Sequence, residues 1–360
     1  MSYVLPLGPY HPALEEPVHV KLLTEGELIK DSEVFIGYNH RGIEKLTEIR
    51  NPIQTITLVE RVCGICSHSH AMTYCLAIEN IAKMEVPKRG SYIRVILSEL
   101  ERLHSHYLWL GLAAHIVAFD SLFMMCFASR EKIMDMLEVI SGNRVNYAMN
   151  IIGGSRRDIS NEQKEILIKM IEELRREYKK IYNIYAKDSS IAARTKGVGI
   201  LTKEDALNYG ACGPHGRASG VNFDVRKTMP YNCYEEFDFN VAVANDGDVF
   251  SRAVVRLIEI EESCKIIEQA LNNMPDGPIN LGNKIPKVPV GEYMAVTEAP
   301  RGEVTYYVVS NGGQTNGRVN IHVPTFKNAM TVPVMLKNNT IADAGLIVAS
   351  IDPCLSCLDR

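Results

Sequence analysis

Two Cys-x-x-Cys pairs lie near opposite ends of this chain, and they constrain its fold more than any other feature. The first pair is Cys63 and Cys66, and the second is Cys354 and Cys357, close to the terminal Arg360. The two-residue spacer lets both sulfurs of a pair face one metal ion, so the four thiolates can form a single soft metal site. Such a site requires a fold that brings the two ends of the chain together. By spacing alone, a structural zinc site or a rubredoxin-like iron is an equal alternative.

Composition bounds the class of protein. At 360 residues with 46% apolar content, the chain can bury a large core. A formal net charge of −4 offers no basic surface for nucleic acid, so we expect no nucleic-acid partner. Nine cysteines without a signal peptide are typical of a reducing compartment. We therefore expect a cytoplasmic chain.

Hydrophobic periodicity predicts an α+β fold that is mainly α, with a core bundle of long helices and small peripheral sheets. Alternating runs on both sides of Gly26 predict a strand pair within the first forty residues. Three- and four-residue spacing of apolar residues predicts helices across 42–137, at 162–185 and at 248–271, and short strands at 304–310 and 319–323. We expect a single domain, 1–360, with a β-rich part (1–40), a helical core (41–280) and a mixed part (281–360) that carries the second cysteine pair.

One apolar stretch, 107–129, is almost long enough to cross a membrane. It contains Asp120, and an aspartate near the centre of a membrane helix costs roughly 2.5–3.5 kcal/mol. A buried core segment is therefore the better interpretation. Membrane association would then depend on partner subunits.

The residues that flank the cysteines carry a resemblance to a known family. The motifs are Arg41-Gly42-Ile43-Glu44, Arg61-x-Cys63-Gly64-x-Cys66, Glu298-Ala299-Pro300-Arg301-Gly302 and Asp352-Pro353-Cys354-x-x-Cys357-x-x-Arg360. Together they resemble the large, catalytic subunit of NiFe hydrogenases. The segments 8–17 and 40–46 resemble the energy-converting, membrane-associated branch (Ech and CO-induced hydrogenases), which is related to the quinone-site subunit of complex I. The resemblance covers essentially the whole chain.

The resemblance implies a binuclear centre and its chemistry. It implies that Cys66 and Cys357 bridge nickel and iron, that Cys63 and Cys354 bind nickel alone, and that the iron carries CO and cyanide. The implied function is reversible heterolytic formation and cleavage of H2. In this branch, reduced ferredoxin supplies the electrons and H2 evolution is coupled to ion translocation.

Two further side chains are expected close to the metals. A helix that starts near Cys66 would place His70 one turn further on, where its ring can donate to the Cys66 sulfur. The resemblance implies the same role for His70. It also matches Thr325 with a hydroxyl that hydrogen-bonds a cyanide ligand.

Arg301 is flanked by Pro300 and a glycine, which suits a side chain that must be aimed. Its guanidinium can place a charge-assisted donor above a metal site. The resemblance implies that Arg301 lies above the open position of the centre, with Pro300 beside the cofactor and a buried aspartate holding the guanidinium. Asp120 fits that aspartate best, because a charge in so apolar a stretch needs a partner.

Proton transfer at the site needs a nearby carboxyl group whose pKa can be tuned by burial. Glu16 resembles the family's first proton acceptor next to a terminal nickel thiolate, and the resemblance implies that the proton passes to the Cys354 sulfur and then to Glu16. Its neighbour Glu15 remains the alternative, because a one-residue shift of the alignment exchanges the two.

Glu44 matches a glutamate that, together with a C-terminal histidine, binds Mg or Fe in many NiFe hydrogenases. Here the last residue is Arg360, and a guanidinium is a donor-only cation that cannot bind a metal. We therefore predict an ion pair between Glu44 and Arg360, and the Mg site is in doubt.

The remaining cysteines lack ligand spacing, so we expect no iron–sulfur cluster in this chain. A small subunit with a 4Fe-4S cluster, further Fe-S and integral membrane subunits, and ferredoxin indirectly are then the implied partners. The chain would be peripheral, on the cytoplasmic side of the membrane. The alternatives are a non-catalytic complex I-like electron-transfer or quinone-site scaffold, a structural Zn or Fe tetrathiolate protein, and a soluble uptake hydrogenase.

Overall fold

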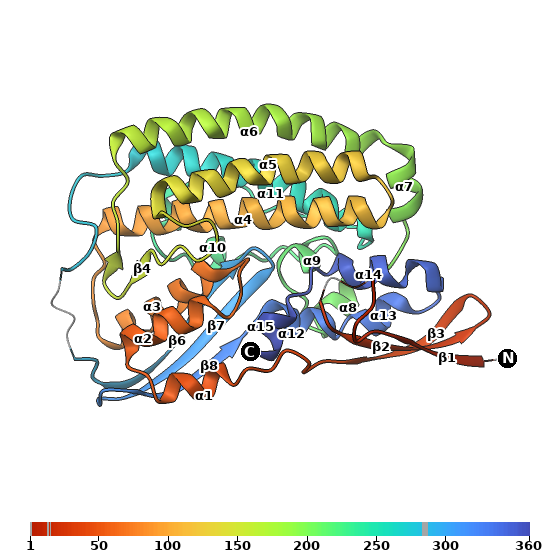
Figure 1. Ribbon diagram of the computed structural model, residues 1–360, viewed down its shortest axis with the longest axis horizontal. Coiled ribbons are helices and arrows are strands. Elements are labelled where there is room, and N and C mark those ends of the chain that lie inside the picture. Colours follow the sequence, from red (N-terminus) through yellow and green to blue (C-terminus); the bar gives the residue numbers. More distant parts are fainter. Residues whose placement is uncertain (1, 13, 15, 283–286) are drawn as a thin grey trace.

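The computed structural model describes residues 2–12, 14, 16–282 and 287–360, which form two main layers and a smaller sheet at one side (Figure 1). The upper layer is a bundle of long helices: α4 (Lys88–Ile116), α5 (Asp120–Ser141), α6 (Asn161–Lys187) and α11 (Val249–Asn273). Each of these helices contacts two of the others, and their apolar faces form the largest buried cluster.

Local sequence explains how α6 forms and where it packs. Ser160 and Gln163 form a capping box, in which each side chain bonds the other residue's backbone N–H and satisfies the first turn. The buried residues of α6 then recur every three or four positions, so one face of this charged helix is apolar and lies on the bundle. These residues are Leu167, Ile171, Leu174, Tyr178, Ile181 and Tyr185.

The lower layer packs helices against an antiparallel sheet. The helices α2 (Pro52–Glu60) and α3 (Ser67–Ile81) lie beside a sheet of order β6 (Val290–Ala299), β7 (Gly302–Asn311) and β8 (Asn316–His322). The helix α3 contacts both β6 and β7, and the short helix α1 (Ile43–Glu48) lies on β8. This arrangement places α3, which directly follows the first cysteine pair, between the bundle and the sheet (Figure 1).

The smaller sheet is N-terminal and extends from one side of the molecule (Figure 1). It has the antiparallel order β1 (Ser2–Leu7), β2 (His19–Glu25) and β3 (Leu28–Phe35), and β3 contacts α13 (Val332–Leu336). The other short elements are β4 (Asn150–Ile151), β5 (Gly154–Ser155), α7 (Ser189–Thr195), α8 (Lys203–Asn208), α9 (Gly213–Arg217), α10 (Val225–Thr228), η1 (Tyr234–Glu236), α12 (Pro324–Ala329), η2 (Ile341–Asp343), α14 (Ala344–Ser350) and α15 (Leu355–Asp359).

The predicted mainly helical fold with small sheets is confirmed, and the helices predicted at 162–185 and 248–271 correspond to α6 and α11. The two-residue strands β4 and β5 were not predicted, and neither were the longer β1 and β6. The strand β1 has almost no buried face, so it lacks the alternation that marks a strand. In β6, burial is confined to the C-terminal half, which the pairing with β7 places against α3.

The apolar stretch 107–129 is two helices rather than one. The helix α4 ends at Ile116, the backbone turns through Ala118 with φ of 62°, and α5 starts at Asp120. Among the described residues, no helix has the length and apolar character needed to cross a bilayer.

Candidate metal centre

The first cysteine pair lies in the turn between α2 and α3. Cys66 immediately precedes the first residue of α3, and the backbone N–H of Ile65 donates to the Cys63 sulfur over 3.2 Å. Both cysteines are buried. The turn therefore points both sulfurs into the space below the bundle.

The second pair is arranged in the same way at the other end of the chain. Cys354 immediately precedes α15, and Cys357 lies within that helix. Its Sγ atom is 3.0 Å from that of Cys354, and both side chains are buried. Each cysteine pair thus lies at the N-terminal end of a helix.

The fold brings the two pairs together, as the spacing required. The sulfurs of Cys63 and Cys354 are 3.3 Å apart, and those of Cys66 and Cys357 are 3.4 Å apart. The sulfurs of Cys63, Cys66 and Cys357 all lie within 4.8 Å of one another. Each member of one pair thus faces its counterpart in the other.

The four thiols cannot all ionise in this space without a cation. Hydrogen bonds from the thiols of Cys354 and Cys357 lower the pKa of Cys63, whereas burial and the neighbouring sulfurs raise the pKa of Cys357 well above its ordinary value. Once Cys63 is ionised, its negative charge therefore opposes ionisation of the other thiols. A bound metal ion removes this conflict, and sulfur donors suit soft metals such as nickel and iron. The donor set fits the metal centre that the sequence implies.

A small cavity adjoins the sulfurs. It is lined by Cys66, His70, Ala299, Arg301, Val304, Val323, Pro324, Thr325, Cys354 and Cys357. Within the described part of the chain, Nη1 of Arg301 is buried and has no hydrogen-bond partner. A buried guanidinium nitrogen without a partner costs free energy unless another group accepts from it. This side chain is therefore available to a group bound in the cavity.

Arg301 occupies the tip of a tight hairpin. Ala299 pairs with Gly302, so Pro300 and Arg301 form a two-residue loop between β6 and β7. Gly302 has φ of 130°, a conformation that strongly favours glycine. Pro300 is buried in this loop but is not among the residues that line the cavity.

Asp352, and not the predicted Asp120, holds Arg301. One carboxylate oxygen of Asp352 accepts from Nε and Nη2 of Arg301, over 2.7 and 2.6 Å. Asp120 is instead exposed at the start of α5, where it bonds the His115 ring over 2.7 Å. The prediction for Asp120 is wrong because the turn at Ala118 ends α4 and carries the aspartate out of the core. Asp352 belongs to the same motif as Cys354, which was the available signal.

A buried ionic network supports the base of this hairpin. Arg102 of α4 donates to the backbone oxygens of Glu298 and Ala299 over 2.7 and 3.2 Å. The Glu298 carboxylate accepts from Arg217, and its backbone N–H donates to the Tyr231 hydroxyl. Sequence reasoning did not find this network, since its partners come from four separate segments.

His70 lies one turn into α3, but it contacts the other cysteine pair. Its Nε2 atom is 3.3 Å from the sulfur of Cys357, and not of the predicted Cys66, while Nδ1 is 2.7 Å from the Tyr306 hydroxyl. Tyr306, on β7, thus turns the ring toward the second pair. Burial lowers the pKa of His70 to about 4, so the ring is neutral and one of its nitrogens carries a proton.

Thr325 and Glu16 both contact the backbone around the second cysteine pair. The Thr325 hydroxyl accepts from the backbone N–H of Cys354 over 3.0 Å. One carboxylate oxygen of Glu16 accepts from the backbone N–H groups of Leu355 and Ser356. Burial raises the pKa of Glu16, although Arg301 and these two N–H groups oppose the shift. Glu15 lies outside the described residues.

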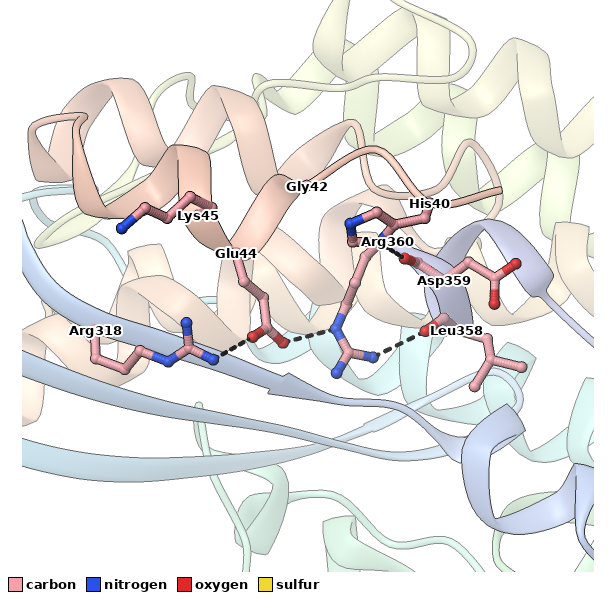
Figure 2. A pocket seen from close by; sticks show the side chains of 8 residues that line it. All are labelled: His40, Gly42, Glu44, Lys45, Arg318, Leu358, Asp359 and Arg360. Atoms are coloured by element: carbon pink, nitrogen blue, oxygen red, sulfur yellow. Dashed lines mark hydrogen bonds and ion pairs between the residues drawn. The ribbon is translucent and has the colours of Figure 1, made fainter. Parts of the chain in front are cut away.

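A second pocket lies where α1, β8 and the C-terminus meet (Figure 2). The predicted ion pair is present there: Arg360 donates from Nε to Glu44 over 2.7 Å. Arg318 donates to the other carboxylate oxygen of Glu44, also over 2.7 Å. Each of the two carboxylate oxygens of Glu44 thus accepts from a guanidinium group (Figure 2).

The segment 37–44, which we call the strap, ties the C-terminus to the first cysteine pair. The Asp359 carboxylate accepts from the backbone N–H groups of Gly37 and Asn39, each over 2.9 Å. Arg41 donates to the backbone oxygens of Val62 and Ser356, each over 2.7 Å. Neither Arg41 nor Asp359 had been assigned a role from the sequence, because their partners are backbone atoms far away in the chain.

Two family models match the chain. The 49-kDa subunit of respiratory-chain NADH dehydrogenase matches residues 117–285 and 280–360, and the nickel-dependent hydrogenase family matches residues 41–122. The second match contains Cys63 and Cys66, and the first contains Cys354 and Cys357. The two cysteine pairs therefore lie in segments matched by two related families.

Curated relatives from both families align with almost the whole chain. A carbon monoxide-induced hydrogenase of Rhodospirillum rubrum is 43% identical over 100% of this chain and 99% of that protein. Membrane-bound hydrogenase subunit alpha of Pyrococcus furiosus is 41% identical over 99% of this chain and 87% of its own length. A subunit of the NADH-quinone oxidoreductase of Clostridium beijerinckii is 38% identical over 99% of this chain and 96% of its own length.

A solved structure shares the whole fold. A chain of the membrane-bound sulfane sulfur reductase, an archaeal respiratory membrane complex, superposes with a TM-score of 0.94 at 33% identity, over 100% of this chain and 98% of that one. The chain therefore belongs to the family that unites the large subunits of energy-converting, membrane-associated hydrogenases with the 49-kDa subunit of respiratory NADH dehydrogenase.

Proposed function

We propose that this chain is the catalytic subunit of an energy-converting NiFe hydrogenase that forms and cleaves H2. The observation that carries the proposal is the complete set of four buried thiols, from two segments at opposite ends of the sequence, beside a buried arginine nitrogen that has no partner in the described protein. A scaffold that only positions electron carriers or a quinone has no need for four facing thiols.

Cys63, Cys66, Cys354 and Cys357 would together hold the nickel and the iron of such a centre. The chemistry that such a centre, with CO and cyanide on iron, supplies when bound is reversible heterolytic splitting of H2. The neutral His70 ring can donate to the Cys357 sulfur and so disperse its negative charge.

Arg301, Glu16 and Thr325 would each have a separate role at the cavity. The guanidinium of Arg301, fixed by Asp352, keeps one positive charge and a free N–H at the cavity. Glu16, whose pKa is raised by burial, would take a proton that leaves the Cys354 sulfur. The Thr325 hydroxyl would donate to a cyanide ligand.

The partners follow from the cysteine spacing. The cysteines outside the two pairs do not have the spacing of an iron–sulfur cluster, so electrons would have to pass through another subunit. We propose a small subunit with a 4Fe-4S cluster, further Fe-S and integral membrane subunits, and reduced ferredoxin as the indirect electron donor. The similarity to subunits of membrane-bound complexes supports a peripheral position in such a complex. We place it on the cytoplasmic side of the membrane, with H2 evolution coupled to ion translocation.

A second candidate is a complex I-like scaffold subunit without H2 chemistry, because a 38% identical relative belongs to an NADH-quinone oxidoreductase. Metal analysis and infrared spectroscopy of the purified complex separate the two. The hydrogenase proposal predicts one Ni and one Fe per chain, with CO and cyanide bands in a region where protein does not absorb. Zinc in place of nickel in active protein, or the absence of these bands, would reject it.

A further inference from the structure

Trp109, the only tryptophan of the chain, lies in α4 and is fully buried. Its indole N–H donates to the backbone oxygen of Ala349, at the end of α14, over 2.8 Å. The backbone N–H of Asp352 donates to the same oxygen over 2.9 Å. One carbonyl thus links the indole directly to the backbone of the residue that holds Arg301.

The indole ring also carries a cation. The guanidinium of Arg256, on α11, lies 4.0 Å from the centre of the Trp109 ring, a distance at which cation–π attraction fixes its plane. Its Nη1 atom donates to the backbone oxygen of Arg252, one turn earlier in α11. Its Nη2 atom is 3.8 Å from Oδ2 of Asp352. Arg256 is therefore an ion-pair partner of the second carboxylate oxygen of Asp352, whereas Arg301 bonds the first.

Asp352 needs such support from outside its own segment. It has φ of 56°, a left-handed conformation that is unfavourable for a residue with a side chain, and Pro353 follows it. Its Oδ1 atom is occupied by Arg301, whereas Oδ2 accepts no hydrogen bond within the described part of the chain. The orientation of this carboxylate is thus determined by Arg301 on one side and by Arg256 on the other.

We propose that Trp109 and Arg256 are positioning residues for Arg301, acting through Asp352. The indole fixes the backbone of Asp352 through Ala349, and Arg256 fixes the second oxygen of its carboxylate. Together they decide where the guanidinium of Arg301 lies over the cavity. This inference rests on the proposed function for its catalytic consequence, and on the contacts alone for its structural one.

The test compares Trp109→Phe and Arg256→Lys with Tyr178→Phe in the purified complex. Trp109→Phe keeps an aromatic ring beneath Arg256 but removes the N–H, and Arg256→Lys keeps the charge but loses the planar guanidinium. Tyr178→Phe is the matched control, because the Tyr178 hydroxyl also donates to a backbone oxygen of the buried bundle, that of Leu257, over 2.9 Å. The control residue contacts neither Asp352 nor the cavity in any hydrogen bond of the described structure.

Four quantities are measured: amide hydrogen exchange at residues 349–354, metal content, the infrared bands of the metal ligands, and kcat and KM for H2 turnover. For Trp109→Phe we expect about tenfold faster exchange of the Asp352 amide, because its acceptor loses an anchoring donor. For both variants we expect unchanged metal content, shifted infrared bands, and kcat reduced at least tenfold with KM within twofold. The control should change none of these.

Exchange in Trp109→Phe that equals the control rejects the proposal, whether or not the wild-type complex contains nickel. Normal kcat and unshifted bands in Arg256→Lys also reject it, since a purely structural role would show only as lower stability. If the wild-type complex lacks nickel and the infrared bands, the proposed function fails, and the exchange comparison alone then decides whether Trp109 positions Asp352.

Discussion

Two of the sites at which N-terminal and C-terminal segments of this molecule meet differ in chemistry. At the thiol junction, four buried sulfurs meet, and they cannot all carry a negative charge unless a cation is present. At the charge junction, Glu44 lies between Arg318 and Arg360, so its negative charge is paired with two positive charges (Figure 2). The first junction thus offers soft donors to a metal ion, whereas at the second each oxygen of Glu44 already accepts from a guanidinium group.

The strap, residues 37–44, connects the two junctions. It bonds both the C-terminal helix, through Asp359, and the turn of the first cysteine pair, through Arg41. These hydrogen bonds hold the C-terminal helix, and with it the second cysteine pair, next to the first pair.

The largest expected effect is at the thiol junction. Arg301→Lys should reduce H2 turnover by about two orders of magnitude or more, because a flexible ammonium cannot reproduce a guanidinium fixed by Asp352. Nickel and iron content should stay at the wild-type level, since no thiol is changed. Activity assays and metal analysis of the same preparation test this. Near-full activity would show that Arg301 does not act at the cavity.

Glu16→Gln should have the next largest effect. The amide oxygen can still accept from the N–H groups of Leu355 and Ser356, but the side chain no longer carries an exchangeable acid proton. Exchange between D2 and water protons should fall about a hundredfold, while conversion of para- to ortho-hydrogen, which does not need the proton to leave, should continue. Equal retention of both would transfer the role to Glu15 or to a water path. Equal loss of both would mean that the centre itself was damaged.

The residues named so far show what sequence can and cannot predict. The four thiols and Arg301 were predicted because each belongs to a short motif whose chemistry is local. Asp352 was missed although it stands two residues before Cys354, because the prediction chose Asp120 as a charge in an apolar stretch that needs a partner. That argument takes 107–129 as a buried segment, whereas the left-handed residue Ala118 ends α4 and leaves Asp120 exposed.

Other contacts were outside the reach of any local pattern. Arg41 and Asp359 bond backbone atoms of distant segments, and backbone atoms leave no signal in a sequence. The partner of His70 was predicted from helical spacing, which correctly gives the turn of α3 but not which of two facing sulfurs the ring meets. The hydrogen bond of Tyr306, on β7, to the His70 ring orients that ring toward Cys357.

The charge junction is tested by Arg360→Met. This change leaves the half-buried Glu44 with Arg318 as its cationic partner and with the backbone N–H of Ile321, and we expect the C-terminal helix to lose about 1–2 kcal/mol of local stability. Amide exchange at residues 355–360 should accelerate about tenfold or more. Lys45→Met is the matched control: Lys45 lines the same pocket, but its side chain is 79% exposed and pairs with Glu48 instead.

A chelator completes this test, since it separates an ion pair from a metal site. If the junction closes without a metal, EDTA should leave the exchange of residues 355–360 in the wild-type complex unchanged. An EDTA effect as large as that of Arg360→Met would show that Glu44 binds a divalent ion. The charge junction would then be a metal site too, and the two junctions would not differ in this respect.

The smallest expected effect is that of Asp120→Ala, which tests the assignment of Asp352 from the opposite side. Asp120 pairs only with His115 in the described structure, and their side chains are 74% and 62% exposed. An exposed ion pair contributes less than about 1 kcal/mol, so the free energy of unfolding and the H2 turnover should both stay close to the wild-type values. A loss of turnover in Asp120→Ala comparable to that of Arg301→Lys would contradict the structure. It would mean that α4 and α5 rearrange in the assembled complex so that Asp120, and not Asp352, holds the arginine.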